Sequence, residues 1–144
     1  MGCWASITLL GCLLAKITIV CAYQVLDICG TSVPTTANTQ QLLMIKQQQR
    51  ADQRPRREFQ KDLPPFLQSK IDDGHKIAFC GNLNEEVGST AGGMSQVATD
   101  LGLIDIHAQT HGPDSEVATY AGLDYILMTK QLASHSTNQP PFLL

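Results

Sequence analysis

The chain has 144 residues, of which 43% are hydrophobic and 16% are charged. This length is typical of one domain, and the hydrophobic share excludes an intrinsically disordered chain. The formal net charge of −3 excludes a uniformly basic chain built to coat nucleic acid. The charge is uneven, because residues 1–62 hold seven basic and four acidic side chains, whereas residues 63–144 hold three basic and nine acidic ones.

The N-terminal stretch is almost wholly apolar, with Lys16 as its only charged side chain. Ser6–Leu10 and Lys16–Val20 are rich in β-branched residues and roughly alternate, which predicts a buried β-hairpin. The alternative is a small membrane-anchored or secreted protein that uses residues 5–23 as its hydrophobic segment. A signal peptide has a basic residue before its apolar run, which is missing here, and a central lysine costs about 2.5–3.5 kcal/mol in a membrane span.

A loop is expected over residues 24–34, followed by a helix. Asn38 and Gln41 have the spacing of a capping box, so the helix is predicted to start there and to run to about Gln49. A run of basic side chains follows: Lys46, Arg50, Arg54, Arg56, Arg57 and Lys61. Such a run is usually a solvated surface, and its alternative role is to contact phosphates, with the four arginines as candidate nucleic-acid ligands.

A second helix is expected to begin at Asp62 and to stop at Gly74. Pro64 and Pro65 would lie in its first turn, where backbone N–H groups have no partner within the helix. Lys76–Cys80 predicts a short buried strand, and a polar loop follows it. Loops at strand ends are where α/β proteins commonly build their sites.

A third helix is predicted between Gly93 and Gly102, because apolar residues recur there at helical spacing: Met94, Val97, Ala98 and Leu101. The rest of the chain is expected to contain a short strand at residues 103–106, a polar loop at 107–115, a strand at 123–128 and an irregular tail after residue 130. Strands that alternate with helices predict a mixed α/β fold.

The five cysteines, at positions 3, 12, 21, 29 and 80, are an odd number and include no Cys-x-x-Cys pair. We therefore expect neither a disulfide framework nor a cysteine zinc site. This cysteine usage favours a reducing, intracellular compartment.

Three segments stand in a characteristic order: residues 2–9 with 16–23, which end in Ala-Tyr; residues 76–85, which contain Gly-Asn-Leu-Asn-Glu; and residues 118–127, which contain Leu-Asp-Tyr-Ile-Leu. Together they resemble the endonuclease/exonuclease/phosphatase superfamily, whose fold is that of deoxyribonuclease. The likeness is greatest to the endonuclease domains of retrotransposons. The resemblance implies a partial two-sheet α/β sandwich over residues 2–130, with an irregular tail at 131–144. It also implies Mg²⁺-dependent hydrolysis of phosphodiester bonds in DNA.

Only some of the family's site residues have counterparts in this chain. Asn84 matches the loop asparagine that donates to the phosphoryl oxygen, Asp124 matches the aspartate that orients a histidine, and Tyr23 matches a tyrosine near the site. Asn82 stands where the family has an aspartate, and an amide cannot act as a general base at neutral pH. The glutamate that binds the metal and the terminal Ser-Asp-His motif have no counterpart.

We therefore expect a degenerate fragment with little or no activity, in which Mg²⁺ is not retained and no residue is assigned as a metal ligand. DNA is the partner that the resemblance implies. The alternative within the same class is a weak nucleic-acid-binding remnant that acts through Lys46–Lys61.

The same residues also have ordinary structural interpretations. Asn82 and Asn84 are typical loop residues. Asp124 lies in an apolar strand, where a buried carboxylate would need a partner such as Lys130 or a backbone amide. Histidines in a polar loop, as expected at positions 107 and 111, are usually exposed, and a metal site there with Asp105 or Asp114 is the minor alternative.

Overall fold

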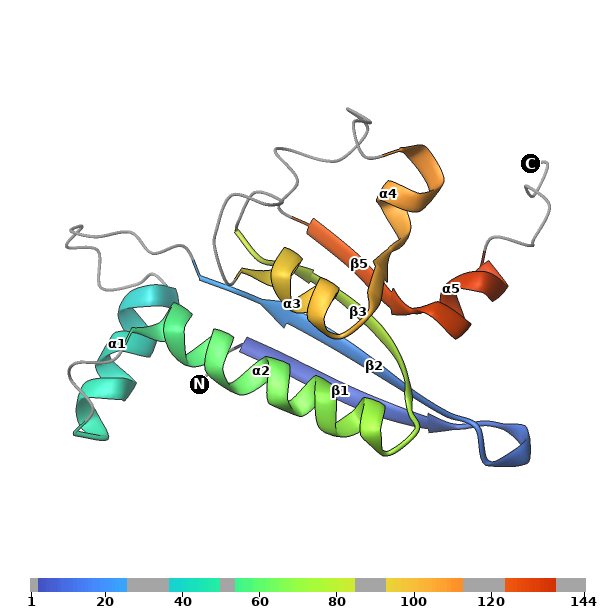
Figure 1. Cartoon of the computed structure of the whole chain (residues 1–144). Coiled ribbons are helices and arrows are strands. Elements are labelled where there is room, and N and C mark those ends of the chain that lie inside the picture. Colours follow the sequence, from blue (N-terminus) through green and yellow to red (C-terminus); the bar gives the residue numbers. More distant parts are fainter. Residues whose placement is uncertain (1–2, 26–36, 50–53, 85–92, 113–123, 137–144) are drawn as a thin grey trace, which may run out of the picture.

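The computed structural model describes residues 3–25, 37–49, 54–84, 93–112 and 124–136. These residues form a five-stranded mixed sheet of order β1-β2-β3-β5-β4 (Figure 1). The strands are β1 (Cys3–Leu10), β2 (Lys16–Tyr23), β3 (Lys76–Asn82), β4 (Leu103–Asp105) and β5 (Asp124–Thr129). β2 and β3 are parallel, and the other neighbouring strands are antiparallel. The predicted mixed α/β class is confirmed.

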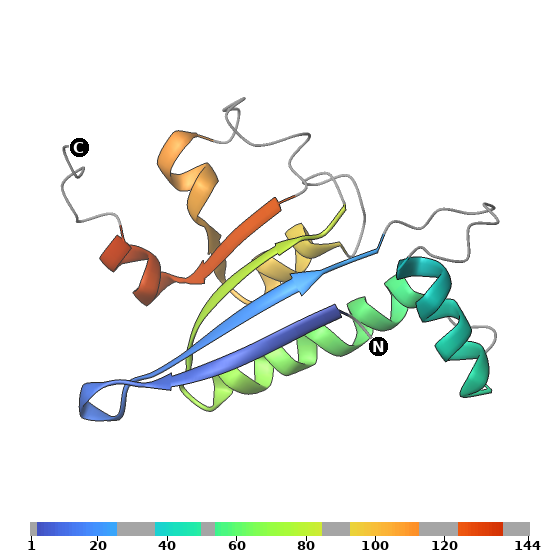
Figure 2. The same cartoon turned by 180° about the vertical axis from the view of Figure 1, so that it is seen from behind.

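The helices are α1 (Ala37–Gln47), α2 (Pro55–Asp72), α3 (Met94–Asp100), α4 (Ile106–His111) and α5 (Lys130–Ser136). Helices α2 and α3 cover one face of the sheet, while α4 and α5 lie toward its β5 and β4 edge (Figure 1). Seen from behind, β1, β2, β3 and β5 have no helix in front of them (Figure 2). The described part of the protein is thus one helical layer on one sheet, with the other sheet face uncovered.

The core lies between the sheet and helices α2 and α3. Alternate strand residues point into it, as the two-residue period of a strand requires, and α2 supplies side chains spaced by four residues. The buried cluster comprises Val20, Ala22, Phe59, Leu63, Leu67, Ile77, Phe79, Leu83, Met94, Ala98, Leu103, Tyr125 and Leu127.

The predicted N-terminal hairpin is confirmed, since β1 pairs with β2 along its whole length. The expectation that the hairpin is buried holds for one face of β2, where Val20 and Ala22 lie in the core, and is wrong for β1 and the tip. Ile7 and Leu9 of β1 are 57% and 47% exposed, and Leu13 at the tip is fully exposed. The reason is that β1 is the outer strand of a sheet with only one covered face. Among the helices that the structure describes, none is both long and apolar enough to span a membrane.

Helix α1 differs from its prediction at both ends. Asn38 lies inside the helix rather than at its cap, and the helix ends at Gln47 rather than at Gln49. Gln41 does not complete a capping box, because its Nε2 donates to Cys3 Sγ (2.7 Å) on β1. The expected loop at residues 24–34 falls mostly outside the described residues.

Helix α2 begins at Pro55, well before the predicted start at Asp62. Pro64 and Pro65 therefore lie inside the helix, and their predicted place in the first turn is wrong. Proline removes a donor to the carbonyl four residues earlier. The carbonyls concerned belong to Gln60 and Lys61, which are half-buried and exposed, so this part of the helix lies where water can replace the missing donors.

Two glycines end helices as predicted. Gly74 has φ 77°, and its N–H donates to the Ile71 carbonyl (2.9 Å) while the N–H of His75 donates to the Lys70 carbonyl (2.9 Å). This is the Schellman pattern, which requires the left-handed conformation that glycine adopts easily. Gly102, with φ 63°, follows α3, and its N–H donates to the Thr99 carbonyl (3.1 Å).

The strands predicted at residues 76–80, 103–106 and 123–128 are confirmed as β3, β4 and β5, but two segments that follow β4 and β5 differ. The polar loop expected at residues 107–115 begins as α4, because Asp105 Oδ1 accepts the N–H groups of His107 (2.9 Å) and Ala108 (3.2 Å). The tail expected to be irregular begins as α5, and residues 137–144 lie outside the described residues.

Candidate functional site

Four residues proposed from the sequence come together at one end of the sheet. Tyr23 of β2 stands opposite Asn82 of β3, and Asn82 stands opposite Asp124 of β5. Directly opposite residues on neighbouring strands point to the same side, so these three form a row on the uncovered face. Neighbouring strands are about 4.8 Å apart, which puts the ends of the row roughly 10 Å apart. Asn84 follows two residues after Asn82.

Hydrogen bonds hold the two asparagines at the strand end. Asn84 has φ 47°, a left-handed conformation that asparagine adopts more readily than most residues. Its backbone N–H donates to Asn82 Oδ1 (3.2 Å), and its Nδ2 donates to the Gln24 carbonyl (2.6 Å). The N–H of Gln24 in turn donates to the Asn82 carbonyl (2.9 Å). These bonds join the ends of β2 and β3, so both asparagines also have a structural role.

Arg56 of α2 reaches the same strand end. Its Nη1 donates to the Asn84 carbonyl (3.3 Å). With the buried Gln24 amide assigned from its hydrogen-bond partners, Oε1 accepts from Arg56 Nε (3.2 Å) and Nε2 donates to the Leu83 carbonyl (2.9 Å). Arg56, a candidate nucleic-acid ligand in the sequence, thus has an internal role. Sequence reasoning missed Gln24, because a glutamine after a strand belongs to no motif.

Asp124 is exposed, so the expectation of a buried carboxylate that needs a partner is wrong. Strand β5 is buried on one side only, with Tyr125 and Leu127 in the core and Ile126 47% exposed. An apolar strand is buried on both faces only if both faces of the sheet are covered, and in the described sheet only one face is covered. The acid instead lies on the face that water reaches.

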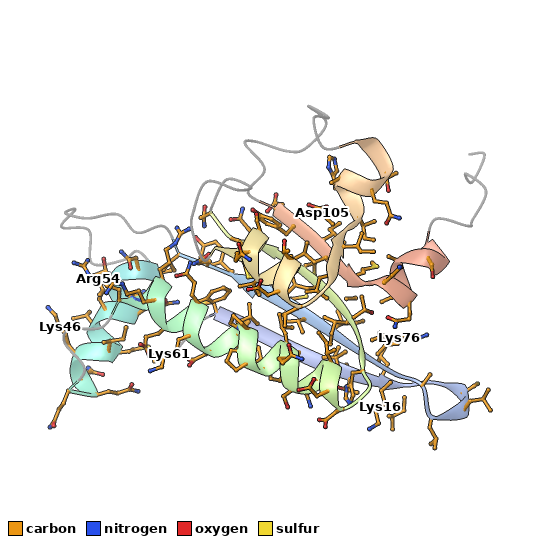
Figure 3. The ribbon with its side chains drawn as sticks, viewed as in Figure 1. Lys16, Lys46, Arg54, Lys61, Lys76 and Asp105 are labelled. Atoms are coloured by element: carbon orange, nitrogen blue, oxygen red, sulfur yellow. The ribbon has the colours of Figure 1, made fainter. Side chains whose placement is uncertain are left out.

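The remaining basic candidates lie around α1 and the first half of α2. Arg54 and Arg57 are exposed at the start of α2. Lys46 and Lys61, also exposed, lie on the same side of the molecule as Arg54 (Figure 3). Arg50 lies outside the described residues.

Two thiols lie in the row of side chains next to the site. Cys21 stands opposite Cys80, with their Sγ atoms 3.3 Å apart. Burial, and then the hydrogen bond and charge of Cys21, raise the pKa of the Cys80 thiol. A raised pKa keeps Cys80 protonated at neutral pH, which makes it a poor nucleophile.

The site can donate and accept hydrogen bonds, and among the residues that the structure describes there, the carboxylate that it offers Mg²⁺ is that of Asp124. In the described ranges, no three side chains of His, Cys, Asp or Glu are grouped to hold a metal ion. At the alternative site, Asp105 caps α4 through its carboxylate, and Asp114 lies outside the described residues. The chain matches no protein-family model and no curated protein sequence.

Proposed function

We propose that this chain is a degenerate relative of the Mg²⁺-dependent endonuclease domains of retroelements, with little or no power to cleave DNA. The observation that carries the proposal is the row of Tyr23, Asn82 and Asp124, with Asn84 beside it. These residues come from the three segments on which the resemblance depends, and those segments lie far apart in the sequence. The resemblance implies that these residues meet at one end of the sheet, where the family binds the phosphate.

We further propose that the fold is one layer of a deoxyribonuclease-like sandwich. Such a sandwich has two sheets whose inner faces are apolar, with helices outside. The described sheet has helices on one face, and its other face exposes Ile7 (57%) and Ile126 (47%). An apolar uncovered face supports this architecture, because a second sheet would bury it.

The proposed loss of activity follows from the chemistry of the site. Hydrolysis of a phosphodiester needs a cation at the phosphate and a base for the attacking water. Asn82 occupies the position of the base, yet it is a neutral amide whose Oδ1 already accepts the N–H of Asn84 (3.2 Å). The glutamate that anchors Mg²⁺ in the family has no counterpart in this chain.

Purified full-length protein is therefore expected to leave supercoiled plasmid DNA intact in Mg²⁺ or Mn²⁺. Asn82→Asp is expected to stay inactive too, since it restores the base position but not the cation anchor. The measurement is the conversion of supercoiled to nicked DNA on a gel, with and without EDTA.

EDTA-sensitive nicking by the wild-type protein would overturn this proposal, provided that an Asn84→Ala, Asp124→Ala double variant purified in parallel is inactive. The double variant is the control for a contaminating nuclease. Nicking by Asn82→Asp alone would show that a cation anchor is present and would overturn the proposed loss of metal binding.

A second candidate function is weak binding of nucleic acid without cleavage. Arg54, Arg57 and Lys61 are exposed, and their spacing of three and four residues puts them on one side of α2. Lys46 of α1 lies on the same side (Figure 3). This local cluster favours contact with phosphates, although the acidic half of the chain opposes strong binding.

Replacing Arg54, Arg57 and Lys61 together by alanine should weaken DNA binding. It should also reduce the magnitude of the slope of log K against log salt concentration by about 3, because each cationic side chain that contacts a phosphate contributes roughly one. The measurement is fluorescence anisotropy of a labelled duplex over a series of salt concentrations. The matched control replaces Lys16, Lys76 and Lys130, which removes the same charge elsewhere. An equal loss of slope in both variants would contradict a specific surface on α2.

A further inference from the structure

The uncovered face of the sheet is the one that Figure 2 shows in front of the helices, and the strand registers place its side chains in rows that run across the strands. The strand registers give four rows: Leu9, Ile17 and Lys76; Ile7, Ile19, Ala78 and Met128; Ala5, Cys21, Cys80 and Ile126; and Cys3, Tyr23, Asn82 and Asp124. We call this surface the bare face. Its two middle rows contain only apolar side chains and thiols.

The bare face exposes several large apolar side chains. Ile7, Leu9 and Ile126 are 57%, 47% and 47% exposed, whereas Val20 and Phe79 on the opposite face are at most 1% exposed. Isolated exposed apolar residues are common on proteins, but a contiguous patch marks a surface that another molecule covers.

The area of the bare face suits a protein partner. The four strands have eight, eight, seven and six residues, so a spacing of about 4.8 Å and a rise of about 3.3 Å per residue give the flat sheet an area of roughly 460 Å². Two such faces in contact would bury about 900 Å² even when treated as flat, and side chains add to this. That value approaches the roughly 1,000 Å² that a specific protein interface needs.

The charges at the two ends of the bare face identify the partner. Lys76 stands at one end of β3, while Asp124 stands beside the other end of β3, on β5. When two copies face each other about a two-fold axis that lies across the strands, the Lys76 end of each copy lies over the Asp124 end of the other. The face is therefore complementary to itself, as a two-fold interface must be.

We propose that a second copy of this chain covers the bare face, so that two identical sheets pack face to face. Sheets packed in this way lie about 10 Å apart and interdigitate their inner side chains. Ile7, Ile19 and Ile126 then become the centre of a shared core. The inference rests on the exposure, register and charges of the bare face and does not depend on the proposed nuclease ancestry.

Pairing through β1 is the competing arrangement. β1 is the outer strand of the sheet, and residues 3–10 contain neither a charged residue nor a proline to protect that edge. Edge pairing would extend the sheet but would leave the bare face exposed. It would also keep Lys76 and Asp124 of the two copies apart, so charge substitutions distinguish the two arrangements.

The first test is the mass of the full-length protein in solution, measured by sedimentation equilibrium over a range of concentrations. We expect a dimer for the wild-type protein and a monomer for the Ile7→Lys, Ile126→Lys double variant. The matched control is Leu43→Lys, Met44→Lys on α1, where the side chains are similarly exposed (51% and 50%) and the dimer should persist. Circular dichroism checks that each variant is folded.

A charge exchange provides the second test. Lys76→Asp and Asp124→Lys should each weaken the dimer about tenfold, and the double variant should return its dissociation constant close to the wild-type value. A monomeric wild-type protein, a dimer that persists with lysines at positions 7 and 126, or a double exchange that restores nothing would overturn the proposal. Growth beyond a dimer would also overturn it, because a two-fold face-to-face contact closes on itself. None of these results depends on whether the protein nicks DNA.

Discussion

A single methyl group added at Gly81 is expected to destabilise the protein by about 3 kcal/mol. A Cβ atom there would collide with the carbonyl oxygen of Ala22 on the neighbouring strand, and it would lie 3.0 Å from the Ala22 carbonyl carbon. Backbone atoms cannot rotate away as a side chain can. Gly81→Ala can therefore be accommodated only if β2 and β3 move apart, which also displaces Asn82 in the candidate site.

The measurement is the free energy of unfolding in urea, followed by circular dichroism. Gly11→Ala is the matched control, because its φ is −95° and the added Cβ would meet Ala15 only at ordinary distances of 3.5 Å or more. We expect that control to change stability by less than about 0.5 kcal/mol. Equal midpoints for the two variants would contradict the close approach of β2 and β3.

Phe79→Ala is expected to have the largest effect of any truncation in the sheet, a loss of about 3–5 kcal/mol. Phe79 is 1% exposed in the middle of the central strand β3 and belongs to the core between the sheet and α2. Its removal leaves a cavity that the surrounding strands cannot fill. A domain of this size has about 5–15 kcal/mol of stability in total, so a large part of it would be lost.

Urea unfolding also tests this second change. Leu43→Ala on α1 is its control, because Leu43 is 51% exposed and buries little surface. A Phe79→Ala variant as stable as that control would show that β3 does not lie in the core as described. If the slope of the free energy of unfolding against urea concentration is unchanged, the substitution has altered the stability alone.

Elements with strong local signals were predicted well. The alternation in β3 and β5, the core stripe of α3 and the glycines that end α2 and α3 depend on residues within a few positions of one another. Backbone preference and hydrophobic period are properties of such short segments. These signals hold in the folded protein because tertiary packing reinforces them.

Elements decided by distant contacts were predicted poorly. The pair of prolines in α2 suggests a helix start at Asp62, but packing of Phe59, Leu63 and Leu67 against the sheet holds the helix together from Pro55 onward. The start of α4 has a local signal that sequence reasoning missed, since Asp105 caps it with its side chain. An aspartate before a short polar segment is equally typical of a loop.

For the candidate site, the residues were proposed from the sequence, but their arrangement in space was not. Tyr23, Asn82, Asn84 and Asp124 were selected on a resemblance, which named the residues but could not give their register. Their alignment across β2, β3 and β5 is a property of strand pairing between residues 59 positions apart on β2 and β3 and 42–50 positions apart on β3 and β5. The contact of Arg56 with the strand end joins two further segments, and no sequence pattern indicated it.

The amino-acid sequence by itself determined that the chain alternates strands and helices and where several of them end. These follow from periodicity and from the backbone preferences of neighbouring residues. Only the tertiary structure decided that one face of the sheet is covered and the other is bare, with Ile7, Ile126 and Asp124 on the bare side. Which face of a strand is buried depends on where helices that are distant in the sequence pack. The alternation of side chains along a strand shows that there are two faces, but it does not show whether helices cover one of them or both.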